Sequence, residues 1–275
     1  MKNRGIVFKL TSLILITSII FFLVVSNHNA KKTRSIFKGN LRDSAENLSY
    51  STLNKIESIL RAVEKIPQQI AISLEGSSYS KEDLLRLIRQ TVENNPEIYG
   101  STIAFEPYMF DPDALYFAPY YHKHEGEIKF TYIGNESYKY FSWDWYKVPK
   151  EKNKSVWSEP YFDEGAGNII MSTYSVPFYQ NVGGEKKLLG IVTADISLAW
   201  LQEMVSSIKI AETGYAFLIS KKGTLITHPR QDLVMNHTIF SLANEFNQPE
   251  LHELGKNMIN GESDFISKKH LFTGK

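Results

Sequence analysis

Residues 138–146, YKYFSWDWY, form the densest aromatic cluster of the chain, with six rings in nine positions. If residues 142–146 are extended, Trp143 and Trp145 point to one side and Tyr146 points to the other. A stripe of this kind builds either part of a hydrophobic core or the wall of a ligand site. The residue types alone leave both interpretations open.

Two later segments could place carboxylates beside these rings. In WSEPYFD (157–163), Pro160 favours an extended backbone, so Tyr161 and Asp163 are expected to share one side. In IVTADISL (191–198), apolar residues alternate with Thr193, Asp195 and Ser197. The apolar face of this strand is predicted to be core, and the polar face is predicted to meet either solvent or a lined cavity.

Two aspartates beside several rings are suited to a cation. A protonated amine over a Trp or Tyr ring gains ~0.5–2 kcal/mol, and a charge-assisted hydrogen bond to a carboxylate adds about 1.5–3 kcal/mol. Without a ligand, two carboxylates in a partly dry pocket repel each other and are poorly solvated. The competing interpretation is an aromatic core with aspartates in solvent.

Other chemistries have less support. The sequence contains no P-loop, GxSxG, HExxH or dinucleotide-binding motif, and it has no cysteine. His122 and His124 could hold a metal from one side of a strand, or could be the exposed tip of a hairpin. Residues 163–168, DEGAGN, could be a calcium loop or a plain turn, and they lack EF-hand spacing. We predict no catalytic residue, no metal and no cofactor, and keep a membrane-anchored, metal-dependent hydrolase as the rival.

The bulk composition is that of a globular protein. Hydrophobic residues make up 43% of the 275 residues and charged residues 22%. The formal net charge is +1 and no long basic run occurs, so nucleic-acid binding is not expected.

Residues 6–26 are an apolar run that contains one charge, Lys9. As a helix this run spans roughly 31 Å, which is enough to cross a bilayer. It predicts an uncleaved anchor in the cell (inner) membrane after a cytoplasmic tail of residues 1–5, with the bulk of the chain outside the cytoplasm. A cleaved signal peptide is the alternative. Basic residues flank both ends of the run, so loop charge does not settle the orientation.

Residues 31–66 are predicted to form one long stalk helix that ends at Pro67. Apolar residues recur there at steps of three and four positions. This narrow stripe is expected to pair with a second copy in a homodimer or to pack on its own domain.

The remaining sequence predicts an α+β fold with antiparallel sheets. Ser80–Asp83 resembles a capping box and opens a helix over 81–94. Strands are predicted over 99–107, 114–121, 127–133, 168–179 and 187–198, with a turn at 122–126 and a helix over 199–208. A hairpin over 214–229, a helix over 248–259 and a strand over 262–269 follow. We expect two PAS-like modules, 67–205 and 206–275, of which the second is truncated.

An apolar anchor, a stalk helix and two such modules resemble the double Cache sensor domain of bacterial transmembrane receptors. The resemblance covers about residues 31–275 and is most specific in WYKVP (145–149), VWSEPYFDEGAGNIIMSTYSVPFY (156–179) and GIVTADISLAWL (190–201). AETGYAFLISKKGTLITHP (211–229) looks like the start of the membrane-proximal module. The resemblance implies no enzyme within this chain. It also implies an output domain elsewhere, in a chemoreceptor, histidine kinase, cyclic-dinucleotide enzyme or serine phosphatase, with 157–240 most similar to the phosphatase-linked sensors.

Many members of that family bind amino acids, and the resemblance carries their motif onto six positions here: Tyr138, Trp145, Tyr146, Tyr161, Asp163 and Asp195. In the family, tyrosines and aspartates hold the ligand's ammonium group, while an arginine and a neighbouring tryptophan hold its carboxylate. Trp143 stands at the arginine position, and a Trp cannot form a bidentate ion pair with a carboxylate.

This departure implies an amine ligand without a free carboxylate: a biogenic amine, a polyamine or a quaternary ammonium compound. A subgroup of the family resembles this pattern and senses amines. An amino acid held by another basic residue is one alternative, and a purely structural stalk module without a ligand is the other.

Overall fold

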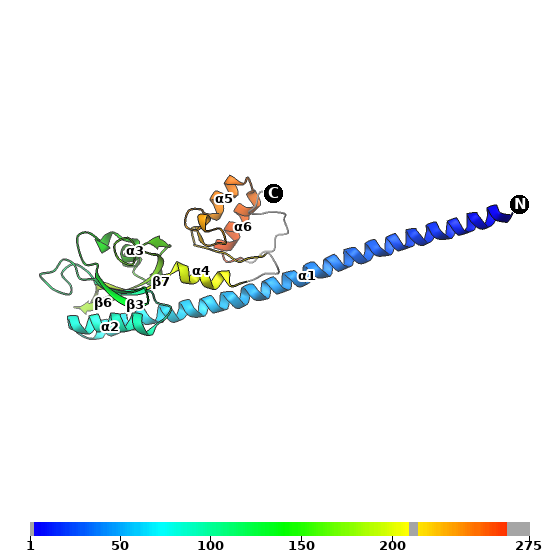
Figure 1. Ribbon diagram of the computed structural model, residues 1–275. Coiled ribbons are helices and arrows are strands. Elements are labelled where there is room, and N and C mark those ends of the chain that lie inside the picture. The colour runs from blue at the N-terminus through cyan, green and yellow to red at the C-terminus, as the bar shows by residue number, and fades with distance from the viewer. Residues whose placement is uncertain (1–2, 209–213, 263–275) are drawn as a thin grey trace. The chain divides into compact units, whose positions relative to one another are not determined.

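The computed structural model describes residues 3–208 and 214–262. The chain divides into two compact units, Met1–Ser51 and Thr52–Lys275. Helix α1 (Asn3–Gly76) supplies the first unit, and its C-terminal part belongs to the second (Figure 1).

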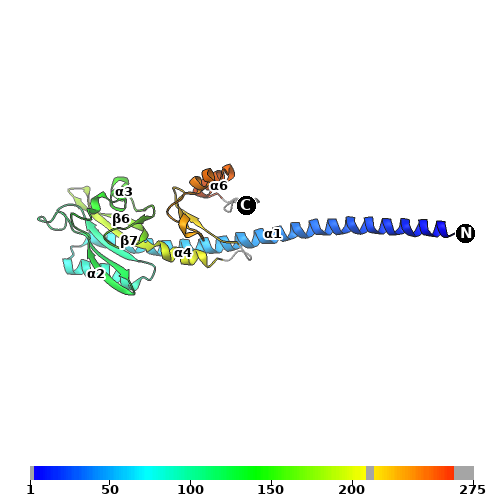
Figure 2. The ribbon, with the colours of Figure 1, turned by 45° about the horizontal axis from the view of Figure 1, so that its top comes forward.

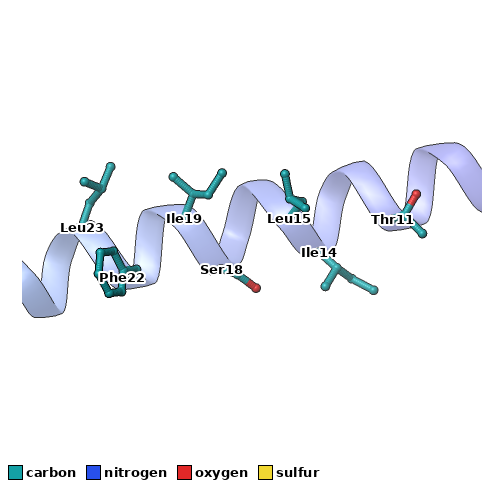
Figure 3. A pocket seen from close by; sticks show the side chains of 7 residues that line it. All are labelled: Thr11, Ile14, Leu15, Ser18, Ile19, Phe22 and Leu23. Carbon is teal, nitrogen blue, oxygen red and sulfur yellow. The ribbon is translucent and has the colours of Figure 1, made fainter.

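The N-terminal part of α1 has the character of a membrane span. In the described chain, α1 is the helix long and apolar enough to cross a bilayer. Figure 3 shows side chains along this part, from Thr11 to Leu23, and most of them are aliphatic or aromatic. The hydroxyl of Thr17 donates to the Leu13 carbonyl at 3.0 Å. Hydroxyls satisfied inside the helix leave few unpaired polar groups, which a lipid-facing helix requires.

Helix α1 does not end at Pro67 as the sequence predicted; it continues to Gly76. A proline inside a helix loses one backbone hydrogen bond and strains the preceding turn. Here tertiary packing outweighs that cost, because Val63, Ile70 and Pro67 itself are buried. The Gln68 side chain adds a hydrogen bond to the Tyr174 hydroxyl at 2.9 Å, so the helix is held to the sheet on both sides of the proline.

A seven-stranded antiparallel sheet forms the centre of the second unit. Its strand order is β3-β2-β1-β7-β6-β4, and β5 also pairs with β6. The strands are β1 (Gly100–Phe105), β2 (Pro119–His124), β3 (Glu127–Tyr132), β4 (Val156–Trp157), β5 (Tyr161–Phe162), β6 (Ile170–Val182) and β7 (Glu185–Ser197). The long hairpin of β6 and β7 is therefore central, and the mixed helix-and-sheet architecture is the α+β fold that the sequence predicted.

Helices cover the two faces of this sheet. The C-terminal part of α1 and α2 (Lys81–Asn94) lie on one face, and α3 (Asp144–Lys152) lies on the other (Figures 1 and 2). Leu84 and Ile88 of α2 pack against Val192 on the first face. On the second face, Trp145 packs in a separate cluster with Ile191, the residue next to Val192 in the strand. Because successive side chains of β7 point to opposite faces of the sheet, this strand contributes to a separate hydrophobic cluster on each face.

Several predicted elements are confirmed with shifted ends. Helix α2 begins with the expected capping box, in which Ser80 and Asp83 bond each other's backbone N–H groups. Strand β2 covers 119–124 rather than 114–121, so the predicted turn at 122–126 is wrong for its first three residues. The turn is confined to Glu125 and Gly126, and both have positive φ.

The region predicted as the second module is described over residues 206–208 and 214–262. Helix α4 (Leu198–Ser206) leads into this region. Its elements are β8 (Leu218–Ile219), β9 (Leu225–Thr227), the 3₁₀ helix η2 (Gln231–Leu233), α5 (Ile239–Glu245) and α6 (Pro249–Ile259). A further 3₁₀ helix, η1 (Tyr140–Ser142), precedes α3. Helix α5 was missed by the sequence analysis. Its Leu242 packs with Leu225 and Leu251 in a small core. The strand predicted over 262–269 lies outside the described residues.

Candidate functional site

Asp195 lies near the end of β7, in the middle of the sheet. Its partners are Thr173 on β6 and Gly100 on β1. Strand alternation puts Asp195 and Thr193 on the same face, and both side chains are buried. The polar face of this strand therefore does not meet solvent, which removes one of the two alternatives that the sequence left open.

Asp163 follows β5 and is buried as well. Phe162 is 53% exposed, whereas Tyr161 and Asp163 face inward, as the alternation predicted. The Tyr138 hydroxyl donates to Asp163 Oδ1 at 2.5 Å, and the Gly167 N–H donates to Oδ2 at 2.8 Å. Each oxygen of this carboxylate is thus held by one donor.

The two carboxylates are electrostatically coupled. Burial and the charge of Asp163 raise the pKa of Asp195 to about 8. Burial also raises the pKa of Asp163, against the opposing effect of its Tyr138 and Gly167 hydrogen bonds. Within the described part of the chain, neither carboxylate forms an ion pair with a basic side chain. A buried acidic pair without a counter-ion is a strong attractor for a cation.

Four tyrosines surround this pair: Tyr99, Tyr120, Tyr138 and Tyr161. Burial raises the pKa of each hydroxyl, and the negative charge of the aspartates raises it further. The pKa of Tyr99 reaches about 12. All four hydroxyls therefore stay neutral at physiological pH, and they can share hydrogen bonds with a bound cation without adding charge.

Two of these tyrosines were not predicted from the sequence. The Tyr99 hydroxyl donates to the Gly167 carbonyl at 2.9 Å. The Tyr120 hydroxyl lies beside Asp195, in electrostatic contact with it but without an aligned hydrogen bond. Tyr120 sits on β2, two strands from Asp195, and only the β1–β2 register brings it there. No sequence signal short of that register could have found it.

Trp143 covers the tyrosine side of the site. Its ring stacks on Tyr138 at 5.1 Å between centroids and lies 5.5 Å from the ring of Tyr161. Its indole N–H donates to the Tyr138 carbonyl at 3.0 Å. Residues 142–146 are not extended, so the side assignment that depended on this condition does not apply: Trp143 is the N-cap of α3 and the helix starts at Asp144. Trp143 nevertheless meets the predicted site residues.

Trp145 and Tyr146 point into the cluster beneath α3. Trp145 is 3% exposed, and its indole lies close to the Tyr138 hydroxyl. The Tyr146 hydroxyl instead donates to Glu106 Oε1 at 2.6 Å, and Lys150 pairs with the same carboxylate at 2.7 Å. Tyr146 is thus not brought to the aspartates in this structure, and its role as a ligand residue stays a prediction.

The arrangement of His122, His124 and residues 163–168 does not support a metal site. His122 is buried, with Nε2 3.3 Å from the Thr131 hydroxyl, and burial lowers its pKa. The His124 ring lies 6.3 Å from it, in a T-shaped contact. Across residues 3–208 and 214–262, no group of three or more His, Asp and Glu side chains is arranged to hold a metal. Residues 163–168 form a turn closed by the Asn168 N–H bond to the Asp163 carbonyl at 2.8 Å.

Gly100 makes room for the Tyr120 hydroxyl. A Cβ at Gly100 would overlap that hydroxyl, and the Tyr120 ring is buried on all sides. Gly100→Ala is expected to lower the unfolding free energy by about 1–3 kcal/mol, as overpacking does, and to push Tyr120 away from Asp195. Denaturant midpoints measure the loss. Gly76→Ala is the control, because a Cβ at Gly76 meets nothing within 4 Å. Equal midpoints for the two variants would contradict this account.

The part of the chain that carries this site is similar to known proteins in sequence and in fold. Residues 84–203, which contain both aspartates and all four tyrosines, match the family model described as "Methyl-accepting chemotaxis protein-like, first PDC sensor domain". The structure resembles the extracellular domain of the candidate histidine kinase mmHK1S-Z3, with a TM-score of 0.69 and 27% identity over 80% of this chain and 81% of that one. The part of the chain that carries the site therefore resembles the extracellular sensor domains of bacterial receptors.

Bacterial chemoreceptors are among the curated relatives of this chain. It is 25% identical to the methyl-accepting chemotaxis protein PscA of Pseudomonas syringae pv. tomato over 86% of this chain and 34% of the relative. The fold also matches the ligand-binding domain of the Pseudomonas aeruginosa chemoreceptor PctB in complex with L-Gln, with a TM-score of 0.55 and 20% identity over 72% of each chain. The chain spans about a third of the length of PscA. The matching family model and the two solved structures named here are sensor, extracellular or ligand-binding domains, not catalytic domains.

Proposed function

We propose that this chain is the sensing part of a membrane-anchored signal-transduction receptor, and that its first module binds a small ligand through an ammonium group. The observation that carries the proposal is the buried pair of Asp163 and Asp195, which has no basic partner among the described residues and is surrounded by tyrosine hydroxyls. An ammonium group supplies the charge that the pair lacks. It also offers several donors, which two carboxylates and neutral hydroxyls can accept.

The energies favour a cation at this place. A charge-assisted hydrogen bond contributes about 1.5–3 kcal/mol, and a cation over an aromatic face contributes ~0.5–2 kcal/mol more. The ring of Tyr161 and the stacked pair of Trp143 and Tyr138 provide such faces. With its pKa raised to about 8, Asp195 keeps its proton in the free protein at neutral pH, and an ammonium group beside it favours the charged form, so the pair is expected to ionise fully when the ligand binds.

Trp143 is the reason to propose an amine rather than an amino acid. By the resemblance drawn from the sequence, Trp143 takes the position of an arginine in the amino-acid sensors of that family, and its indole N–H is already used by the Tyr138 carbonyl. A tryptophan in that position offers apolar surface and no positive charge. The proposed ligand is therefore an amine without a free carboxylate, held by Asp163, Asp195 and the surrounding tyrosines.

An amino acid is the second candidate. PctB and PctC, which share the fold, have structures in complex with L-Gln and with GABA respectively. A carboxylate in this chain would need another clamp, from a basic side chain that moves on binding. The competing structural interpretation, without a ligand, rests on the close cover that Trp143 gives to Tyr138 and Tyr161.

A thermal-shift screen of the 275-residue chain in detergent tests the proposal. The panel pairs each amino acid with its decarboxylated amine and adds polyamines, quaternary ammonium compounds and simple carboxylates. A ligand at 100 times its dissociation constant stabilises the folded state by about 2.7 kcal/mol. Shifts with amines are expected. Shifts only with amino acids would favour the second candidate, and a folded sample that is silent across the panel would favour the structural one.

Trp143→Arg is expected to restore binding of amino acids. An arginine can keep the stack on Tyr138 and present a bidentate fork to a carboxylate. The affinity for an amino acid should rise about tenfold or more, while the affinity for the matching amine should change little. Titration calorimetry of both ligands measures this change. Trp143→Phe, which keeps a ring and adds no charge, is the control. If wild type already binds the amino acid more tightly than the amine, the proposed ligand class is wrong.

Signal transmission follows from the elements that carry the site. The same sheet packs on the C-terminal part of α1 through Val63, Ile70 and Leu74. We propose that closure around the ligand shifts α1 or the second module and so acts on a span in the cell membrane, with the sensor modules outside the cytoplasm. We also propose a homodimer through the stalk part of α1. The output domain, whether of a chemoreceptor, kinase, cyclase or phosphatase, stays a prediction.

A further inference from the structure

Ser175 carries a buried hydroxyl that the proposed ammonium site does not use. The residue is 0% exposed, and its Oγ has no hydrogen-bond partner among the described residues. Leaving a buried hydroxyl unpaired costs free energy, and folded proteins rarely keep such a group without a purpose. A ligand that reaches it would remove this cost.

The register of the sheet places Ser175 beside the ammonium site. Thr173 lies opposite Asp195, and Ser175 lies opposite Thr193. Residues two apart on a strand share a face, so Ser175 is on the face of Asp195 and is its diagonal neighbour, at about 7–8 Å between Cα atoms. The Thr173 hydroxyl already meets the Tyr161 hydroxyl at 2.8 Å. The Ser175 hydroxyl is therefore the next polar group along this face, on the side where α3 packs against β6.

We propose that Ser175 determines ligand specificity by binding a second polar group at the far end of the amine. This inference rests on the proposed function, because Asp163 and Asp195 fix the ammonium end. The spacing between Asp195 and Ser175 suits a short ligand, with on the order of two to four carbons between its two polar groups.

The second polar group is a hydroxyl rather than a second ammonium. The partners of Ser175 on the neighbouring strands are Thr193 and Val156, which are uncharged. A second ammonium buried there would lack a counter-charge, whereas a neutral hydroxyl needs only one good hydrogen bond. The ligand class is thus a short amino alcohol.

Matched pairs of probes test this inference on the 275-residue chain in detergent. Ethanolamine, 3-aminopropan-1-ol and 4-aminobutan-1-ol are each compared by calorimetry with the alkylamine that has a methyl group in place of the hydroxyl. Wild type is expected to prefer the best amino alcohol over its alkylamine by about three- to tenfold, the effect of one hydrogen bond. Ser175→Ala should abolish this preference without weakening the alkylamine, and Ser175→Thr should keep it.

Ser101→Ala is the matched control. Ser101 is equally buried, but its hydroxyl donates to the Thr193 carbonyl at 2.7 Å, inside the sheet. Its loss should lower stability and leave the preference unchanged. If alkylamines bind as well as amino alcohols, or Ser175→Ala keeps the preference, the inference is overturned and the ammonium site stands. If no amine binds at all, the proposed function fails first and the inference fails with it.

Discussion

Asp195→Asn is expected to weaken amine binding by about 100-fold or more. The substitution keeps the shape of the side chain and removes the charge that pairs with the ammonium group in a buried place, where loss of one partner costs several kcal/mol. Asp195 is 3% exposed, so solvent cannot compensate. Titration of the variant with the best amine of the screen measures the loss, and circular dichroism shows whether the fold is retained.

Asp144→Asn is the control for this experiment. It makes the same change in net charge, but its side chain is 78% exposed and lies in the first turn of α3. The affinity of the Asp144→Asn variant for the amine should stay within about twofold of the wild-type affinity. If both variants bind as wild type does, the amine is held elsewhere and the acidic pair is not the site.

The stability of the free protein is expected to fall as the pH rises from about 4 to about 8. The pKa of Asp195 is raised from 3.8 to about 8, so the folded chain holds this proton where the unfolded chain has released it. Because the folded state binds more protons in this window, the unfolding free energy decreases as the pH rises. The shift of about four units corresponds to on the order of 5 kcal/mol in the limit above pH 8.

Melting curves of wild type and Asp195→Asn between pH 5 and 8.5 measure this effect. The midpoint of wild type should fall by about 5–10 °C relative to the variant. Asp163 contributes in the same direction, since its pKa is also raised. His122 and His228, whose pKa values are lowered, contribute in the opposite direction and are present in both proteins. A saturating amine should flatten the wild-type curve. Parallel curves without ligand would mean that Asp195 ionises normally in the folded state.

Local patterns in the sequence were enough to find the two carboxylates. Alternation along 191–198 put Asp195 on a polar face, and Pro160 kept the next residues extended so that Tyr161 and Asp163 shared a side. The capping box at Ser80 likewise gave the start of α2. These predictions rest on neighbours within a few residues, where backbone geometry fixes the direction of a side chain.

The parts that failed depend on contacts between distant segments. Helix α1 continues past Pro67 because buried residues on both sides of the proline pack against the sheet. Rules that consider only neighbouring residues in the sequence do not contain these contacts. Tyr120 joins the site only through the pairing of β1 with β2 and the absence of a side chain at Gly100. The start of α3 at Asp144 lies within an aromatic run for which the sequence analysis predicted no helix, and it depends on the packing of Trp145 under the helix.

One measurement tests the central claim most directly: calorimetric titration of the 275-residue chain in detergent with an amine and with the amino acid that has the same side chain. The account predicts that the amine binds, that it binds more tightly than its amino acid, and that Asp195→Asn abolishes this binding. An amino acid that binds more tightly than its amine, or an amine that binds Asp195→Asn as well as wild type, would contradict it.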